Sequence, residues 1–269
     1  MNPRELYYIY DKPVPYKSLL IYPVGMRNYH LFYYYADCLL LENDAKPNEE
    51  VLKKMNISMV EYQKAILTMG YLEFLYFSAT KENDLINKLY GLIVLSLRKE
   101  EDKTFTFDVG YDDNNKAILT INGEIYSSKD FDEIRMIISE YNDIKLPNMN
   151  TQKEIREAIK KKKKISSGNS KQADIEDLIV ALSSSTGFEL EYIYNLSIRK
   201  FSKMLERVDA KLHYTMYATA SMSGMVDFKD KSFVSKHYWL ADLKTDELDD
   251  ILISLDSVKE NLSPDGIKK

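Results

Sequence analysis

The chain has little of the side-chain chemistry on which most enzymes and metal proteins depend. Its 269 residues include one Cys and three His, and its nine Gly form no phosphate-binding motif. A lone Cys cannot form an intramolecular disulfide. His30, His213 and His237 lie in separate segments, without the spacing that a metal site needs. We therefore expect no catalytic residue, no cofactor and no metal site, and the chain is predicted not to be an enzyme.

Long hydrophobic runs are also missing. No uncharged apolar stretch reaches the length of about 18 residues that suggests a membrane-spanning helix. The N-terminal segment carries Arg4 and Glu5 and lacks the apolar core of a secretory signal. These features predict a cytoplasmic protein.

Neither sign of charge is in large excess, because 37 Lys and Arg face 42 Asp and Glu. The net charge of −5 gives no global signature of a nucleic-acid-binding protein. Its distribution is uneven, at −6 over residues 1–150, +6 over 151–171 and −5 over 172–269. A charge run followed by a Ser, Gly and Asn stretch is typical of a linker. We predict an N-terminal mixed α/β domain at 1–150, a basic helix or linker at 151–172 and a C-terminal helical domain at 173–269.

Five consecutive lysines dominate the basic segment: Lys160, Lys161, Lys162, Lys163 and Lys164. The pattern favours a solvated linker or helix end. Two other interpretations stay open: the lysines contact a polyanion such as nucleic acid, or they dock onto an acidic protein surface.

The hydrophobic periodicity predicts an α+β fold that is mostly helical. Four of the seven prolines fall in the first 25 residues and indicate an extended arm or edge hairpin there. A small antiparallel β-meander is predicted in the first half, from strands at 104–109, 117–121 and 124–126 with an Asn-Gly turn. Helices are predicted over 27–41, from Ser58 to Met69, from residue 83 or 84 to Leu97, from a Ser128 cap to Tyr141, and over 174–182, 189–194 and 198–220. A last helix begins at Thr245.

Three local patterns each have a structural interpretation. Cys38 is expected to be a small buried hydrophobic residue. The three histidines are expected to be packed and hydrogen-bonded. The polar run at 112–115 is expected to be a hairpin turn, because Asp and Asn favour turns and the spacing of a calcium loop is missing.

Tyrosine is abundant, with 21 copies, of which nine lie in residues 1–35. Tyr buries a ring and keeps a polar hydroxyl, so it is enriched at protein interfaces. The alternative is a biased amino-acid pool, since Lys, Asn, Ile and Tyr are all frequent in proteins of AT-rich genomes. Both explanations remain open at this point.

Four groups of sequence blocks resemble tail-morphogenesis proteins, of the tail assembly chaperone-like kind, from bacteriophages and prophages of Gram-positive bacteria. The blocks are YDKPVPYK and IYPV at 10–17 and 21–24, SKDFDEIRMII at 128–138, ADIEDL and TG at 173–178 and 186–187, and IRKF, RVDAKL, MSGMV and HYW at 198–201, 207–212, 222–226 and 237–239. The resemblance implies a protein that helps to build a phage tail, in the cytoplasm of the bacterial host. Such proteins are thought to keep the tape-measure protein soluble until tail-tube subunits polymerise around it.

The resulting hypothesis is a non-enzymatic tail assembly protein that binds the tape-measure or tail-tube protein. Its predicted partner-binding residues are Tyr7, Tyr8, Tyr10, Tyr16 and Tyr22 in the N-terminal arm, and Tyr214, Tyr217, Met222, Met225 and Trp239 in the second half. The alternatives are a structural tail or connector subunit retained in the virion, and a nucleic-acid-associated phage factor that acts through Lys160 to Lys164.

Overall fold

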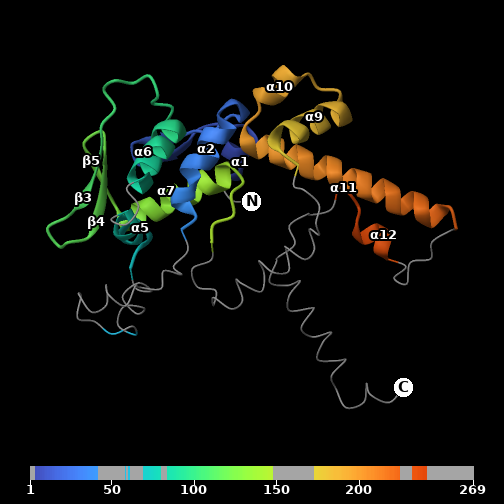
Figure 1. Cartoon of the computed structure of the whole chain (residues 1–269). Helices are drawn as coiled ribbons and strands as arrows, with labels where there is room; N and C mark the ends of the chain where they lie inside the picture. The colour runs from blue at the N-terminus through green and yellow to red at the C-terminus, as the bar shows by residue number, and fades with distance from the viewer. Residues whose placement is uncertain are drawn as a thin grey trace, which may run out of the picture. The chain divides into compact units, whose positions relative to one another are not determined.

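The computed structural model describes residues 4–41, 58, 60, 69–79, 84–147, 173–224 and 232–240. Within them, helices alternate with a two-stranded and a three-stranded antiparallel sheet. The α+β class and the mostly helical content are therefore as predicted (Figure 1). The predicted boundary segment at 151–172 and the predicted helix at Thr245 lie outside the described residues, as does nearly all of the predicted helix at 58–69.

The N-terminal segment forms a short helix and then a hairpin. Helix α1 (Glu5–Ile9) precedes strands β1 (Val14–Tyr16) and β2 (Leu19–Ile21), which pair antiparallel with Val14 opposite Ile21. The hairpin was predicted, whereas α1 was not. Pro3 precedes this helix and Pro13 follows it in the sequence. The prolines that suggested an extended arm therefore leave the stretch between them free to form a helix.

Several helices of the first half pack on one another. A 3-10 turn, η1 (Met26–Asn28), leads into α2 (Tyr29–Ala36) and a second turn, η2 (Asp37–Leu39); α5 (Tyr71–Ala79) and α6 (Asp84–Leu97) follow. Helix α6 contacts both α2 and α5. Five of the nine residues of α5 are buried. A helix that is apolar on most sides shows no amphipathic period, which is why periodicity missed it.

The β-meander consists of β3 (Phe107–Tyr111), β4 (Ala117–Ile121) and β5 (Glu124–Ser127), in that spatial order. Asn122 and Gly123 both have positive φ, as a two-residue turn of the I′ type requires. Strand β3 begins later than the predicted 104, because the Asp102 carboxylate accepts hydrogen bonds from Thr104 and holds it in a turn. One face of β4 is buried and contacts α5 and α7.

Helix α7 (Ser128–Tyr141) is the central helix of the first half. Its cap is Ser127, one residue before the predicted Ser128: the Ser127 hydroxyl accepts from the Asp130 amide while the Asp130 carboxylate accepts from the Ser127 amide. Ser128 instead donates to Glu73 on α5, 2.6 Å away. The prediction chose the wrong serine because both precede the same apolar period, and only backbone geometry decides which one stays extended.

The second half is helical. It contains α9 (Ile175–Thr186), α10 (Leu190–Tyr194), the 25-residue α11 (Ile198–Met222) and the short α12 (Phe233–Lys236). Ser197 caps α11 as predicted, since its hydroxyl accepts from the Lys200 amide, and Gly224 with positive φ follows the end of the helix. Helix α9 runs on through the Ser-rich stretch that was predicted to end it, and Gly187 with positive φ comes just after it.

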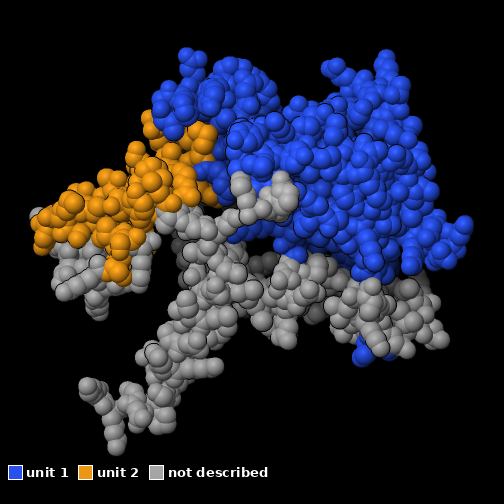
Figure 2. Space-filling model, turned by 180° about the vertical axis from the view of Figure 1, so that it is seen from behind, with its two compact units in different colours: residues 1–149, 186–203 blue, residues 150–185, 204–269 orange. Residues whose placement is uncertain are grey.

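The chain divides into two compact units (Figure 2). Unit 1 holds residues 1–149 and 186–203, and unit 2 holds residues 150–185 and 204–269. The first turns of α11 belong to unit 1 and the remainder to unit 2. Among the described residues, no helix combines the length and the hydrophobicity of a membrane span.

The capping box of α7 makes a first prediction. Ser127→Ala should lower the free energy of unfolding by about 1 kcal/mol, because it removes the acceptor for an otherwise unpaired amide of the first turn. Ser127→Thr keeps a hydroxyl that can accept from the Asp130 amide and donate to the Asp130 carboxylate, so it should cost less than about half of that. Urea unfolding of the three proteins measures both values. A loss for Ser128→Ala with none for Ser127→Ala would contradict the assigned cap.

Candidate partner-binding surfaces

Two of the predicted partner-binding tyrosines anchor the N-terminal segment to α7. Tyr8 is 4% exposed, packs its ring 4.9 Å from that of Tyr141, and donates its hydroxyl to Glu140 at 2.7 Å. Burial, then this hydrogen bond, raises the pKa of Tyr8. Tyr16 donates to Asp130 at 2.8 Å, and burial followed by that bond raises its pKa to about 12. Both rings therefore have a structural role within unit 1.

Tyr7 and Tyr22 are half-buried in the same unit. The Tyr7 carbonyl accepts a hydrogen bond from the Tyr141 hydroxyl at 3.1 Å. The Tyr22 ring lies 4.5 Å from the Arg98 guanidinium, and the Tyr22 amide donates to the Ser96 carbonyl. Each position is thus tied to the fold by its backbone.

Tyr10 is the exposed member of the group. It follows the last residue of α1 and is 64% exposed, and Leu6 and Ile9 of that helix are each about half exposed. We name these three residues the α1 patch. Leu6 and Ile9 were not among the predicted contact residues, since an isolated stretch of five helical residues carries too short a period to reveal which face is bare.

Asp130 is the electrostatic centre of the N-terminal attachment. Burial alone would raise the pKa of its carboxyl group, but hydrogen bonds from Lys17, Ser127 and Tyr16 outweigh that and hold it well below its usual range. Lys17 Nζ lies 2.7 Å from one carboxylate oxygen. The hairpin, the end of β5 and the start of α7 are therefore joined at one ionised side chain.

In unit 2, aromatic side chains gather between α11 and the segment around α12. This α12 cluster consists of Tyr214, Tyr217, Phe233, His237, Tyr238 and Trp239. Tyr217 has its ring 5.0 Å from Phe233 and 5.3 Å from His237, and Tyr214 lies edge-on to Tyr238 at 5.5 Å. Arg207 donates to the Trp239 carbonyl at 2.7 Å. Tyr214, Tyr217 and Trp239, predicted separately from the sequence, thus meet in one cluster.

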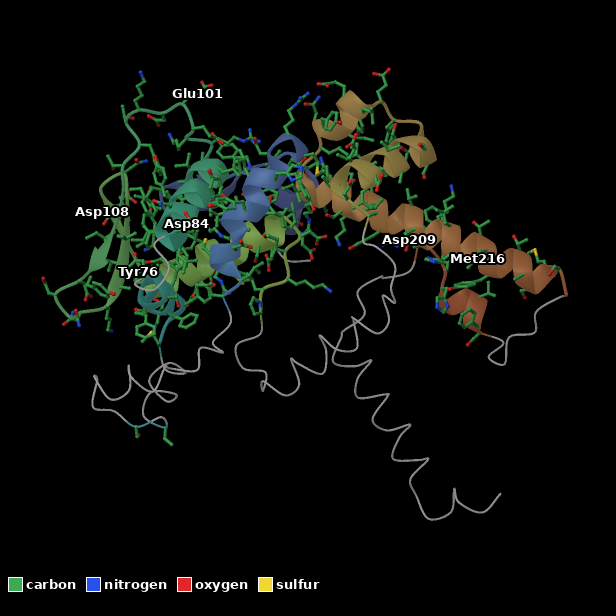
Figure 3. The ribbon with its side chains drawn as sticks, viewed as in Figure 1. Tyr76, Asp84, Glu101, Asp108, Asp209 and Met216 are labelled. Carbon is green, nitrogen blue, oxygen red and sulfur yellow. The ribbon has the colours of Figure 1, made fainter. Side chains whose placement is uncertain are left out.

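A second face of α11 is apolar, partly buried up to Val208 and exposed from Leu212 onward. Its residues recur at helical spacing, and we name them the α11 stripe: Met204, Leu205, Val208, Leu212, Met216 and Met222. Val208 and Tyr217 are about 2.5 turns apart, so the stripe and the α12 cluster lie on opposite sides of the helix. Leu212, Met216 and Met222 are 62%, 55% and 88% exposed. Figure 3 labels Met216 on this part of α11.

The stripe contains one predicted contact residue, Met222, and adds Leu212 and Met216, which were not among the predicted contact residues. Periodicity identified the apolar face correctly. It could not show that only Ile198 and Phe201, in the first turn, are fully buried. Met225 and Lys160 to Lys164 lie outside the described residues.

The scarce Cys and His residues have varied surroundings. Cys38 is fully buried as predicted, and burial, with the nearby Asp37 charge, raises the pKa of its thiol to about 12. All three histidines are exposed, although each packs against an aromatic ring as expected. His213 stacks on Tyr217 and lies 3.3 Å from Asp209, and His237 contacts the Phe233 carbonyl. The described residues contain no group of three such side chains that could hold a metal ion.

The polar run at 112–115 forms the predicted turn. The Asp112 carboxylate accepts hydrogen bonds from the Asn114 and Lys116 amides, and Asn115 has positive φ between β3 and β4.

The surfaces of unit 2 fall in the part of the chain that a family model matches. Residues 160–244 match the model of the YomV second domain. This is a domain of phage and prophage proteins. The YomV-like region, as we call residues 160–244, contains the α12 cluster and the whole α11 stripe. No curated protein and no solved structure gives a significant match.

The low pKa of Asp130 predicts a pH-dependent contribution to stability. A carboxyl group with a lowered pKa stabilises the fold above its unfolded-state value, near 3.9, and loses this contribution as the pH falls through the folded-state value. The difference in free energy of unfolding between the parent and Asp130→Asn should therefore be largest near pH 6 and shrink below about pH 4. Urea unfolding across this range measures it, with exposed Asp113→Asn as the control. A difference independent of pH would contradict the assignment.

The contrast along α11 makes another prediction. Phe201→Ala should lower the free energy of unfolding by about 3–5 kcal/mol, because the ring is 3% exposed and leaves a cavity. Leu212→Ala should change it by less than about 0.5 kcal/mol, because that side chain is already mostly in solvent. Thermal unfolding followed by circular dichroism separates the two. Similar losses would mean that the stripe is buried in the folded protein.

Proposed function

We propose that the protein is a non-enzymatic phage factor of tail assembly, which acts in the cytoplasm of the bacterial host and binds a tail protein, the tape-measure or tail-tube protein. The observation that supports this most is the α11 stripe. It is an apolar helical face inside the YomV-like region, and its residues Leu212, Met216 and Met222 are more than half exposed. The resemblance of the sequence blocks to tail-morphogenesis proteins gives the proposed client.

The chemistry of the stripe suits a chaperone-like binder. Large exposed apolar side chains at helical spacing form one apolar face, on which the apolar face of an amphipathic partner helix can pack. Met216 and Met222 are unbranched and polarizable, so they can adapt to different partner side chains. Such a surface can cover a long apolar client without demanding one sequence from it.

The α12 cluster supports the stripe from the opposite face. Its ring contacts and the Arg207 hydrogen bond tie the segment 233–239 to α11. These contacts hold α11 in place. Less conformational entropy is therefore lost when a partner binds to its apolar face.

Co-expression with the tape-measure protein of the same phage tests the proposal. The parent should increase the amount of soluble tape-measure protein. Leu212→Glu combined with Met222→Glu should reduce the co-purified amount about tenfold or more, since each loss of about 1.4 kcal/mol in binding is a factor of ten.

The matched control is Ser221→Glu, compared with Met222→Glu alone. The two positions are adjacent and exposed, and each change adds one negative charge, but only Met222 belongs to the stripe. The control should retain client binding. If the parent leaves the client as insoluble as it is alone, and also fails to bind the tail-tube protein, the proposal is wrong. Stoichiometric recovery of the chain in purified virions would favour a structural tail subunit instead.

A further inference from the structure

We propose that a second copy of this chain pairs with the outer edge of β3, so that the β-meanders of the two copies form one continuous antiparallel sheet. Among the described residues, β3 is an outer strand of its sheet, because β4 lies between it and β5. Figure 3 labels Asp108 on this strand. The inference concerns unit 1 and does not rest on the proposed function.

Hydrogen bonding to β4 leaves every second residue of β3 facing the outer edge. Just before the strand, the Asn122 amide donates to the Thr106 carbonyl at 2.9 Å. Hydrogen-bonded and non-hydrogen-bonded pairs alternate along antiparallel strands, so every second residue from Thr106 onward bonds to β4. The backbone N–H and C=O groups of Phe107, Val109 and Tyr111 therefore point away from β4.

The central amide of this edge is satisfied by a side chain. The Val109 N–H donates to the carboxylate of the preceding Asp108 at 2.9 Å, and Asp108 is exposed. A charged side chain on an outer strand restricts which strands can pair with it. A partner strand must therefore offer a carbonyl to Val109 and place no negative charge opposite Asp108.

The strand meets both conditions when it pairs with itself, antiparallel, about a two-fold axis at Val109. Phe107 then lies opposite Tyr111 of the second copy, and Val109 lies opposite Val109 of the second copy. All three pairs join residues whose backbone groups face the edge, and each such pair exchanges two hydrogen bonds. Asp108 lies opposite Gly110 of the second copy, which has no side chain.

Charge selects this register over its neighbours. Moving the axis to residue 108 places two copies of Asp108 directly opposite each other, and moving it to Gly110 places Asp108 opposite Asp112. Like charges directly opposite each other destabilise a strand pair. The axis at Val109 avoids both contacts, since the only charge within β3 then faces a glycine.

Aromatic side chains beside the edge extend the contact. Tyr111 is 55% exposed, although its ring lies 5.8 Å from that of Tyr76, and Tyr90 is 47% exposed with its ring 5.4 Å from Phe107. Pairing places Phe107 of the second copy beside Tyr111, and cross-strand aromatic pairs are stabilising. Two strands of five residues remain small beside the roughly 1,200–2,000 Å² of a stable interface. We therefore expect a reversible dimer with a Kd of about 1–100 μM.

Sedimentation velocity of the full-length chain tests the pairing. The parent should change from monomer to dimer as its concentration rises through about 1–100 μM. Val109→Pro should weaken the dimer about tenfold or more, because it removes the central donor from both copies. That N–H points away from β4, and proline is tolerated at such a position of an outer strand.

The matched control is Ile125→Pro on β5, the other outer strand. Ile125 follows Glu124, whose hydrogen-bonded pair with Ile121 closes the Asn-Gly turn, so the Ile125 amide also points away from β4. This variant should dimerise as the parent does. Circular dichroism checks that both proline variants keep the helical content of the parent.

Cross-linking tests the register without a proline. Val109→Cys places one thiol of each copy at the axis, where paired Cα atoms are about 5.5 Å apart and within the range of a disulfide. With diamide as oxidant it should form covalent dimers about tenfold faster than Ile125→Cys, which is exposed on β5. Native Cys38 is fully buried and does not interfere.

A parent that stays monomeric across the concentration range would overturn the inference, as would equal cross-linking rates for the two cysteine variants. A dimer that is lost in Leu212→Glu with Met222→Glu and kept in Val109→Pro would also overturn it, because the contact would then lie on the α11 stripe. Pairing through β3 in a chain that leaves both candidate clients unbound would remove the proposed function and leave this inference standing.

Discussion

The attachment of the N-terminal segment to α7 is the constraint on which unit 1 depends. Residues near the start of the chain reach this helix through tyrosine hydroxyls that donate to carboxylates: Tyr8 to Glu140 and Tyr16 to Asp130. Arg4 pairs with Glu133 at 2.9 Å on the same helix. These contacts join segments more than a hundred residues apart, so their strength depends on α7 being formed and capped. A tyrosine serves here better than a phenylalanine, because its ring fills the core while its hydroxyl satisfies a carboxylate at the edge.

A buried cation fixes the other side of α7. Arg135 is 8% exposed, lies with its guanidinium 3.5 Å from the Tyr71 ring centroid, and donates two hydrogen bonds to the Leu39 carbonyl. Burial lowers the pKa of Arg135. A charge removed from water is tolerated where its hydrogen bonds and an aromatic face compensate for the lost hydration. The result links η2, α5 and α7 through one side chain.

Helix α11 carries two surfaces whose residues alternate along the sequence. One face carries aromatic rings and is covered by the segment around α12, and the opposite face carries aliphatic and Met side chains that are exposed from Leu212 onward. A helix with a fully buried stripe would be a core element and nothing more. Because burial is complete only in its first turn, α11 is anchored at one end and available along the rest. This difference turns an ordinary amphipathic helix into a candidate binding element.

The sequence by itself determined most of the local structure. The β-meander, its Asn-Gly turn, the turn at Asp112, helix α6 and the boundaries of α11 all follow from nearest-neighbour chemistry, since turn residues, caps and periodicity act within a few residues. It did not reveal α5, which has no polar face, or the choice of Ser127 over Ser128. It also could not sort the tyrosines: Tyr8 and Tyr10 lie two residues apart, yet one is buried against Tyr141 and the other is 64% exposed. Burial depends on which distant segment covers a side chain, and only the tertiary structure decided that for the tyrosines and for the α11 stripe.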